Sequence, residues 1–141
     1  MVSSNLPPVR GCLLDTGIFI AAERDEFDLV KFVLNRPQMP YAMSAVTAAE
    51  LMLGLELATP DNREKRRENI NVYFANFPIH DFDVFCARQW AAITAALRAK
   101  GQMIGANDLL IAATALHYDY DIVTFNKREF SRIPNLTVIT P

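Results

Sequence analysis

The chain has 141 residues, 51% of them hydrophobic, and a formal net charge of −2 at pH 7. This length and composition fit one folded domain, exclude a disordered chain and exclude a general basic field that would attract nucleic acid. The apolar runs are far shorter than the ~20 residues of a membrane span, and the polar start lacks the features of a signal peptide.

Hydrophobic periodicity predicts strands that alternate with helices along the whole chain. The predicted elements, in chain order, are a strand over 11–14, helices over 17–22 and 27–34, a strand over 41–43, helices over 44–57 and 61–74, a strand over 77–80, helices over 84–100 and 108–117, and strands over 122–124 and 137–139. This alternation favours an α/β fold with a mostly parallel sheet and right-handed crossovers. We expect a single domain over 1–141, with 1–8 a flexible N-terminal segment.

Three acidic residues lie in apolar surroundings, where an unpaired charge is unfavourable. Asp15 ends the first strand, Glu50 lies among Ala, Val and Leu residues, and Asp108 opens an apolar helix. Asn126 follows the 122–124 strand. Because the carboxyl ends of parallel strands meet at one edge, and helix N-termini favour negative charge by ~0.3–1 kcal/mol, all four side chains are expected to converge. Several carboxylates with one shared partner indicate a hard divalent cation, Mg²⁺ or Mn²⁺, and hence a metal-dependent phosphate enzyme.

Taken singly, each acidic residue has an ordinary structural role open to it. Asp15 fits a strand-end turn or a helix cap, Glu50 fits a capping box with Thr47, and Asp108 fits an N-terminal cap. Two hydroxyl residues near the expected site, Thr16 and Thr124, are open to two interpretations: they orient a carboxylate or a metal-bound water, or they are ordinary strand-end residues.

Four segments resemble the motifs of PIN domains, in the order and spacing of that family. They are VRGCLLDTGI at 9–18, SAVTAAELMLGLE at 44–56, GANDLLIAATA at 105–115 and IVTFNKREF at 122–130. Each motif is weakly specific alone, but in this order they span most of the chain. The closest subgroup is the VapC-type toxin ribonucleases of bacterial toxin–antitoxin pairs.

The resemblance implies a three-layer α/β/α fold with a central, mostly parallel sheet, and a cytoplasmic endoribonuclease that uses Mg²⁺ or Mn²⁺. Carried over by position, Asp15, Glu50 and Asp108 are the metal ligands, and with Asn126 they form the catalytic set. Many family members have an acid where this chain has Asn126. Glu129 lies three residues on, and two positions are open to it: it leans toward the site and replaces the missing acid, or it pairs with Arg132 at the surface, which is the alternative we favour. The resemblance also implies an RNA substrate, a cognate antitoxin protein and a homodimer.

Other functions fit the sequence less well. A haloacid dehalogenase needs a second Asp two residues after the first, where this chain has Gly17. A response regulator built on Asp81 leaves Glu50 and Asp108 without a role. A PIN-fold module that binds RNA or protein without cutting it remains the main alternative.

Some further residues carry weaker expectations. Asp81 and Asp83 fit helix caps, and the charged stretch 63–68 fits a solvated helix face. His80 and His117 have no Cys or His partner at zinc spacing, which argues against a zinc site. Lys127, Arg128 and Arg132 lie beside the expected site, so they are better placed than the 63–68 stretch to contact RNA phosphates. The residues expected in the core or a dimer interface are Phe82, Phe85 and Trp90. Cys12 and Cys86, without paired spacing, are typical of reduced core thiols.

Overall fold

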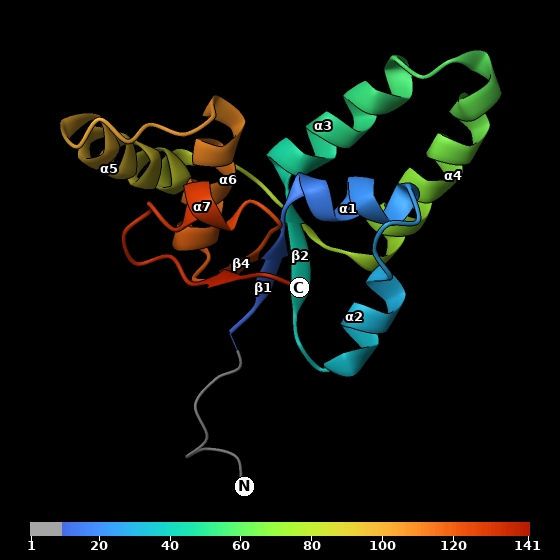
Figure 1. Ribbon diagram of the computed structural model, residues 1–141, viewed down its shortest axis with the longest axis horizontal. Coiled ribbons are helices and arrows are strands. Elements are labelled where there is room, and N and C mark those ends of the chain that lie inside the picture. The colour runs from blue at the N-terminus through green and yellow to red at the C-terminus, as the bar shows by residue number, and fades with distance from the viewer. Residues whose placement is uncertain (1–9) are drawn as a thin grey trace, which may run out of the picture.

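The computed structural model describes residues 10–141 as helices packed around one small parallel sheet (Figure 1). The expected flexible segment 1–8 lies outside the described residues. The strands are β1 Cys12–Leu14, β2 Tyr41–Ser44, β3 Ile79–His80, β4 Asp121–Val123 and β5 Val138–Ile139. The helices are α1 Thr16–Glu23, α2 Leu29–Asn35, α3 Ala45–Glu56, α4 Pro60–Asn76, α5 Val84–Ala99, α6 Ala106–His117 and α7 Lys127–Phe130.

The strand order is β3-β2-β1-β4-β5, and every neighbouring pair is parallel. This arrangement makes β1 the central strand, with β2 on one side and β4 on the other. In Figure 1, β1 and β2 run side by side, and α1 and α3 start at their carboxyl ends. The predicted α/β fold with a parallel sheet is therefore confirmed.

The two faces of the sheet bury separate apolar cores. Alternate β1 residues point to opposite faces, as the pleat requires: Leu13 lies in the core that α5, α6 and α7 cover, whereas Cys12 and Leu14 lie in the core that α1, α2, α3 and α4 cover. The central strand β1 has helices on both faces and is buried throughout, so its sequence is continuously apolar. The three layers expected from the family resemblance are present.

The observed helix boundaries follow from local capping chemistry. Ser44 caps α3 by accepting a hydrogen bond from the Thr47 amide at 2.9 Å, and Asp83 caps α5, as expected. Helix α6 begins at Ala106, two residues before Asp108. Its N-cap residue is Gly105, which makes no side-chain capping hydrogen bond. The short helix α7 falls in a segment for which the sequence predicted no separate helix. Among residues 10–141, no helix combines the length and apolarity needed to cross a membrane.

Gly11 provides a test of this packing, because the Tyr120 ring lies against its backbone. A Cβ atom at position 11 would overlap the ring, whereas one at Gly17, in α1, would meet nothing within 4 Å. We expect Gly11→Ala to lower the free energy of unfolding by about 1–3 kcal/mol, as overpacking does. Gly17→Ala, the matched control, should retain or raise stability, by up to about 1 kcal/mol. Urea titrations of both variants measure the difference, and equal stabilities would contradict this packing.

Candidate active site

The structure brings the four predicted side chains to the carboxyl edge of the sheet. Asp15 directly follows β1, and Asn126 lies three residues after β4. Glu50 lies in the second turn of α3 and Asp108 in the first turn of α6. Hydrogen bonds through Thr16, Thr124 and Asn126 join these four segments into one cluster. The predicted convergence is therefore observed.

Asp15 is buried, with 7% of its surface exposed, and its orientation is fixed through both carboxylate oxygens. Oδ1 accepts from the Thr16 amide at 2.8 Å, and Oδ2 accepts from the Thr124 hydroxyl at 2.7 Å. Burial raises the pKa of Asp15, and the nearby Glu50 charge acts in the same direction, whereas these two hydrogen bonds lower it. Asp15 also caps α1, so the structural role open to it from the sequence applies.

A chain of hydroxyl groups holds Glu50 from the other side. Thr16 Oγ1 lies 2.7 Å from Glu50 Oε1 and 2.9 Å from Thr47 Oγ1. A carboxylate can only accept, so Thr16 gives its single hydroxyl proton to Glu50, and Thr47 must donate to Thr16. Ser44 in turn donates to Thr47 Oγ1 at 3.2 Å. Each hydroxyl group therefore donates to the next, from Ser44 through Thr47 and Thr16 to Glu50. This chain holds the Glu50 carboxylate in one position.

Asn126 connects the two remaining acidic groups. Its side-chain amide donates to Asp108 Oδ2 at 3.4 Å and to Glu129 Oε2 at 3.0 Å. Its backbone amide donates to Thr124 Oγ1 at 2.9 Å, which ties this loop to the hydroxyl that also holds Asp15. Glu129 thus lies within the acidic cluster.

The expected surface pairing of Glu129 with Arg132 is wrong. Arg132 donates to the Met103 carbonyl at 3.1 Å, whereas Glu129 accepts from Asn126. The loop after β4 therefore turns Glu129 toward Asp108 and away from the basic residue that follows it.

Two of the structural alternatives from the sequence do not apply. No capping box forms between Thr47 and Glu50, because Ser44 is the cap of α3. Asp108 makes no cap, since α6 begins before it. Thr16 and Thr124 each orient a carboxylate, which was one of their two interpretations.

The electrostatics of the cluster match a cation site. Burial and the charges of Asp15, Glu129 and Glu50, in that order, raise the pKa of Asp108 from its ordinary value of 3.8 to about 6. The ion pairs that form among residues 10–141 lie elsewhere and involve none of these four acids. Clustered carboxylate oxygens without a basic partner form the donor set that Mg²⁺ and Mn²⁺ prefer.

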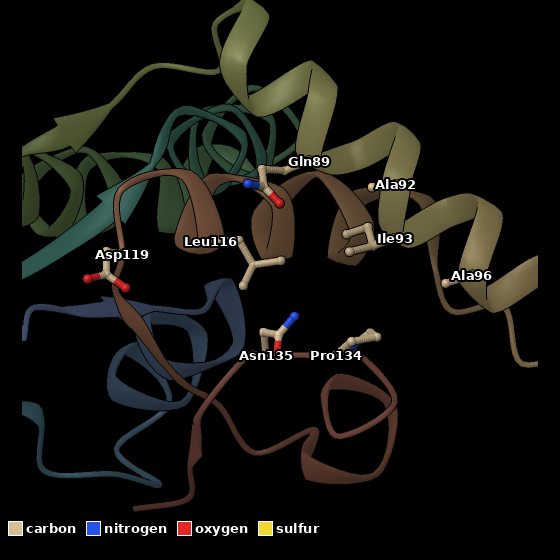
Figure 2. A pocket seen from close by; sticks show the side chains of 8 residues that line it. All are labelled: Gln89, Ala92, Ile93, Ala96, Leu116, Asp119, Pro134 and Asn135. Atoms are coloured by element: carbon tan, nitrogen blue, oxygen red, sulfur yellow. The ribbon is translucent and has the colours of Figure 1, made fainter.

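Two hollows in the surface differ in their relation to this cluster. A pocket of about 340 Å³ lies between α5 and the loop at Pro134 and Asn135 (Figure 2). Its one charged lining residue, Asp119, pairs with Arg10, so it lacks the groups for hydrolysis. A second groove, of about 390 Å³, borders the cluster at Glu50 and is otherwise mainly apolar.

A separate group of ligand-type side chains was missed in the sequence. Asp83 and Cys86 at the start of α5 and His117 at the end of α6 place three donor atoms within 4.8 Å of one another. His117 is far from both in sequence, so only the packing of α5 on α6 brings them together. The one signal in the sequence that could have indicated this group is the spacing of Asp83 and Cys86, which are three residues apart at the start of a helix.

An acidic cluster at the carboxyl edge of a parallel sheet defines an α/β protein with a candidate cation site, and comparison with known proteins identifies the family. The PIN domain profile matches residues 12–136. Ribonuclease VapC of Rickettsia bellii is 34% identical over 131 residues, which are 92% of this chain and 96% of that protein. The tRNA(fMet)-specific endonuclease VapC of Salmonella typhimurium is 30% identical over 128 residues, 89% of this chain and 94% of that protein.

Solved structures agree with this assignment. A chain in the crystal structure of VapBC2 from Rickettsia felis, bound to a promoter DNA fragment, superposes with a TM-score of 0.84 at 30% identity. The superposition covers 92% of this chain and 98% of that one. The chain therefore belongs to the PIN-domain family, and within it to the VapC-type toxins. The resemblance and fold class predicted from the sequence are confirmed.

The raised pKa of Asp108 predicts a pH dependence of stability. A carboxyl with a higher pKa in the folded than in the unfolded chain stabilises the fold at low pH, and that contribution is lost as the pH rises. In metal-free protein we therefore expect the free energy of unfolding of the wild type to fall, relative to Asp108→Asn, between about pH 4 and pH 6. Urea titrations across this range, in EDTA, measure the difference. A relative gain in wild-type stability would contradict the raised pKa of Asp108.

Proposed function

We propose that this protein is an endoribonuclease that hydrolyses RNA phosphodiester bonds with Mg²⁺ or Mn²⁺, as the toxin of a type II toxin–antitoxin pair. The observation that carries the proposal is the convergence of Asp15, Glu50 and Asp108 in a cluster without a basic partner in the described part of the chain. Such a cluster is electrostatically unfavourable unless a cation neutralises it. The names of the VapC relatives support RNA as the substrate.

The side chains have distinct roles in this proposal. Asp15, Glu50 and Asp108 hold the divalent ion, which would neutralise the phosphate charge and activate a water for attack on phosphorus. Thr124 and the hydroxyl chain ending at Thr16 keep two of these carboxylates in place before the ion arrives.

Asn126 and Glu129 complete the site on the side of Asp108. The Asn126 amide carries no charge but can orient water or substrate through its oxygen. Glu129 supplies the acidic group that many family members have at position 126, since it lies beside Asp108 and acts on its pKa. This assignment replaces the surface role expected from the sequence.

The RNA and its approach to the site can be proposed from the surrounding residues. Lys127 and Arg128 are exposed at the start of α7, directly after Asn126. We propose that they contact backbone phosphates flanking the cleaved bond, together with Arg132. One relative is named for cleaving initiator transfer RNA, so a structured RNA is the substrate class we favour.

The protein partners follow from exposed apolar surface near the site. The groove beside Glu50 is lined by Val46, Leu53 and Leu110 among others, and Leu53 and Leu57 expose 57% and 76% of their surfaces. We propose that the antitoxin covers apolar surface of this kind and that the toxin forms a homodimer. We also propose that the protein is cytoplasmic, because its two cysteines are free thiols. VapBC complexes of relatives support an antitoxin partner.

Cleavage of structured RNAs tests the enzyme proposal against a PIN-fold module that only binds. We expect Mg²⁺- or Mn²⁺-dependent cleavage that EDTA abolishes, and a loss of about 100-fold or more in Asp15→Asn and Asp108→Asn, since both remove a ligand charge. Asp61→Asn, an exposed acid in α4, is the matched control and should retain activity. RNA binding without cleavage by the wild type, in either metal, would favour the binding module.

Glu129 and Asn126 are tested by two substitutions that change charge with little change in shape. Glu129→Gln should lower cleavage by about tenfold or more and weaken Mg²⁺ binding, because one acid leaves the cluster. Asn126→Asp should tighten Mg²⁺ binding, because one acid joins it. Calorimetric titration with Mg²⁺ and rates of RNA cleavage report both effects, and Glu64→Gln on α4 is the control. Cleavage by Glu129→Gln within a few-fold of the wild type would return Glu129 to a surface role.

A further inference from the structure

A second group of potential ligands lies outside the acidic cluster, where α5 and α6 pack against each other. Asp83 is the residue that caps α5, Cys86 lies one turn into α5, and His117 is the last residue of α6. One ligand atom from each lies within 4.8 Å of the other two. The set combines one thiol, one imidazole and one carboxylate from two helices.

The donor atoms point toward a common space. Asp83 uses Oδ1 to cap the Phe85 and Cys86 amides, at 3.0 Å each, which leaves Oδ2 facing His117 Nε2 at 3.6 Å. That separation is too long for a hydrogen bond but matches the distance between two ligands of one tetrahedral ion. Bond lengths of about 2.3 Å to sulfur and about 2.0 Å to nitrogen or oxygen place such ligands about 3.3–3.5 Å apart, so the Asp83 and His117 atoms would move slightly closer on binding. Small side-chain adjustments would therefore bring all three atoms to one ion.

The surroundings hold the imidazole in position. The Phe85 ring stacks on His117 with centroids 5.6 Å apart and planes at 12°, and Tyr118 meets it edge-on at 4.7 Å. Cys86 is fully buried, whereas the Asp83 and His117 side chains are 42% and 28% exposed. The site is thus closed on the sulfur side and open to solvent on the carboxylate side, which leaves room for a water as a fourth ligand.

We propose that Asp83, Cys86 and His117 form a zinc site that ties the start of α5 to the end of α6. Sulfur and nitrogen ligands favour Zn²⁺ over Mg²⁺, whereas the all-oxygen cluster around Asp108 favours the harder ions. On binding, the Cys86 thiol releases its proton to solvent. Two anionic ligands and one neutral imidazole then balance the charge of the ion. The sequence argued against zinc because His117 lacks a nearby ligand along the chain, and the packing of α5 on α6 supplies the missing ones.

Co²⁺ and Zn²⁺ titrations of the purified full chain test this proposal. We expect one Co²⁺ per chain to give a near-ultraviolet thiolate charge-transfer absorption that Zn²⁺ displaces, whether or not a further ion enters the acidic cluster, which has no thiol. We also expect Zn²⁺ to raise the melting temperature, because it binds the folded chain. Cys86→Ser should abolish the absorption, and His117→Gln should lower Zn²⁺ affinity by about 100-fold or more, since loss of an outer partner alone costs about 10–100-fold.

Three further variants distinguish this site from metal binding elsewhere on the chain. Cys12→Ser should retain the absorption, because Cys12 is the other buried thiol and is not part of the group. Asp108→Asn should retain it as well, because it alters only the acidic cluster. Asp83→Asn keeps a side-chain oxygen that can cap α5, so this variant should fold, and it should still lower Zn²⁺ affinity. It therefore tests the site even if the Cys86 variant does not fold. Absence of the absorption, or Zn²⁺ affinity unchanged in both His117→Gln and Asp83→Asn, would overturn the proposal.

Discussion

The mutual repulsion of carboxylates at one edge of the sheet is the constraint on which the rest of this structure depends. Burial raises the pKa of Asp108 to about 6 together with the charges of Asp15, Glu129 and Glu50, which lie close to it. The free energy of this arrangement is unfavourable without a cation. The apolar cores beneath the sheet and the hydrogen bonds from Thr16 and Thr124 must therefore hold the acids together in its absence.

The strand order determines which acid is held most rigidly. Asp15 follows β1, the central strand, so it receives a hydroxyl from the β4 side and lies beside the hydroxyl chain from the β2 side. Asp108 lies on a helix start, and within residues 10–141 its side chain accepts a hydrogen bond from the Asn126 amide alone. The site therefore combines one fixed acid with others that have more freedom, which would suit the proposed binding of both an ion and a phosphate.

The sequence was sufficient to predict the parallel sheet and the three acids, because each feature has a local signature. Asp15 ends an apolar strand, and Glu50 and Asp108 interrupt apolar helices, whatever their distant neighbours are. The role of Glu129 was misjudged because two nearby partners, Asn126 and Arg132, were equally available in sequence, and only the path of the loop after β4 decides between them. The grouping of Cys86 with His117 was hidden for a related reason, since it arises from helix packing.

The length of the edge strands restricts how this protein can assemble with others. Both edges of the sheet, β3 at Ile79–His80 and β5 at Val138–Ile139, consist of two residues. So short an edge offers too few free backbone groups to recruit an extended peptide as an added strand, which is one way that proteins avoid edge-to-edge aggregation. A partner that binds tightly must instead use the helical surfaces, so its recognition depends on side-chain shape and is easily altered by substitution. Closely related toxins with the same sheet can therefore diverge in partner choice without any change to the strands that position their acids.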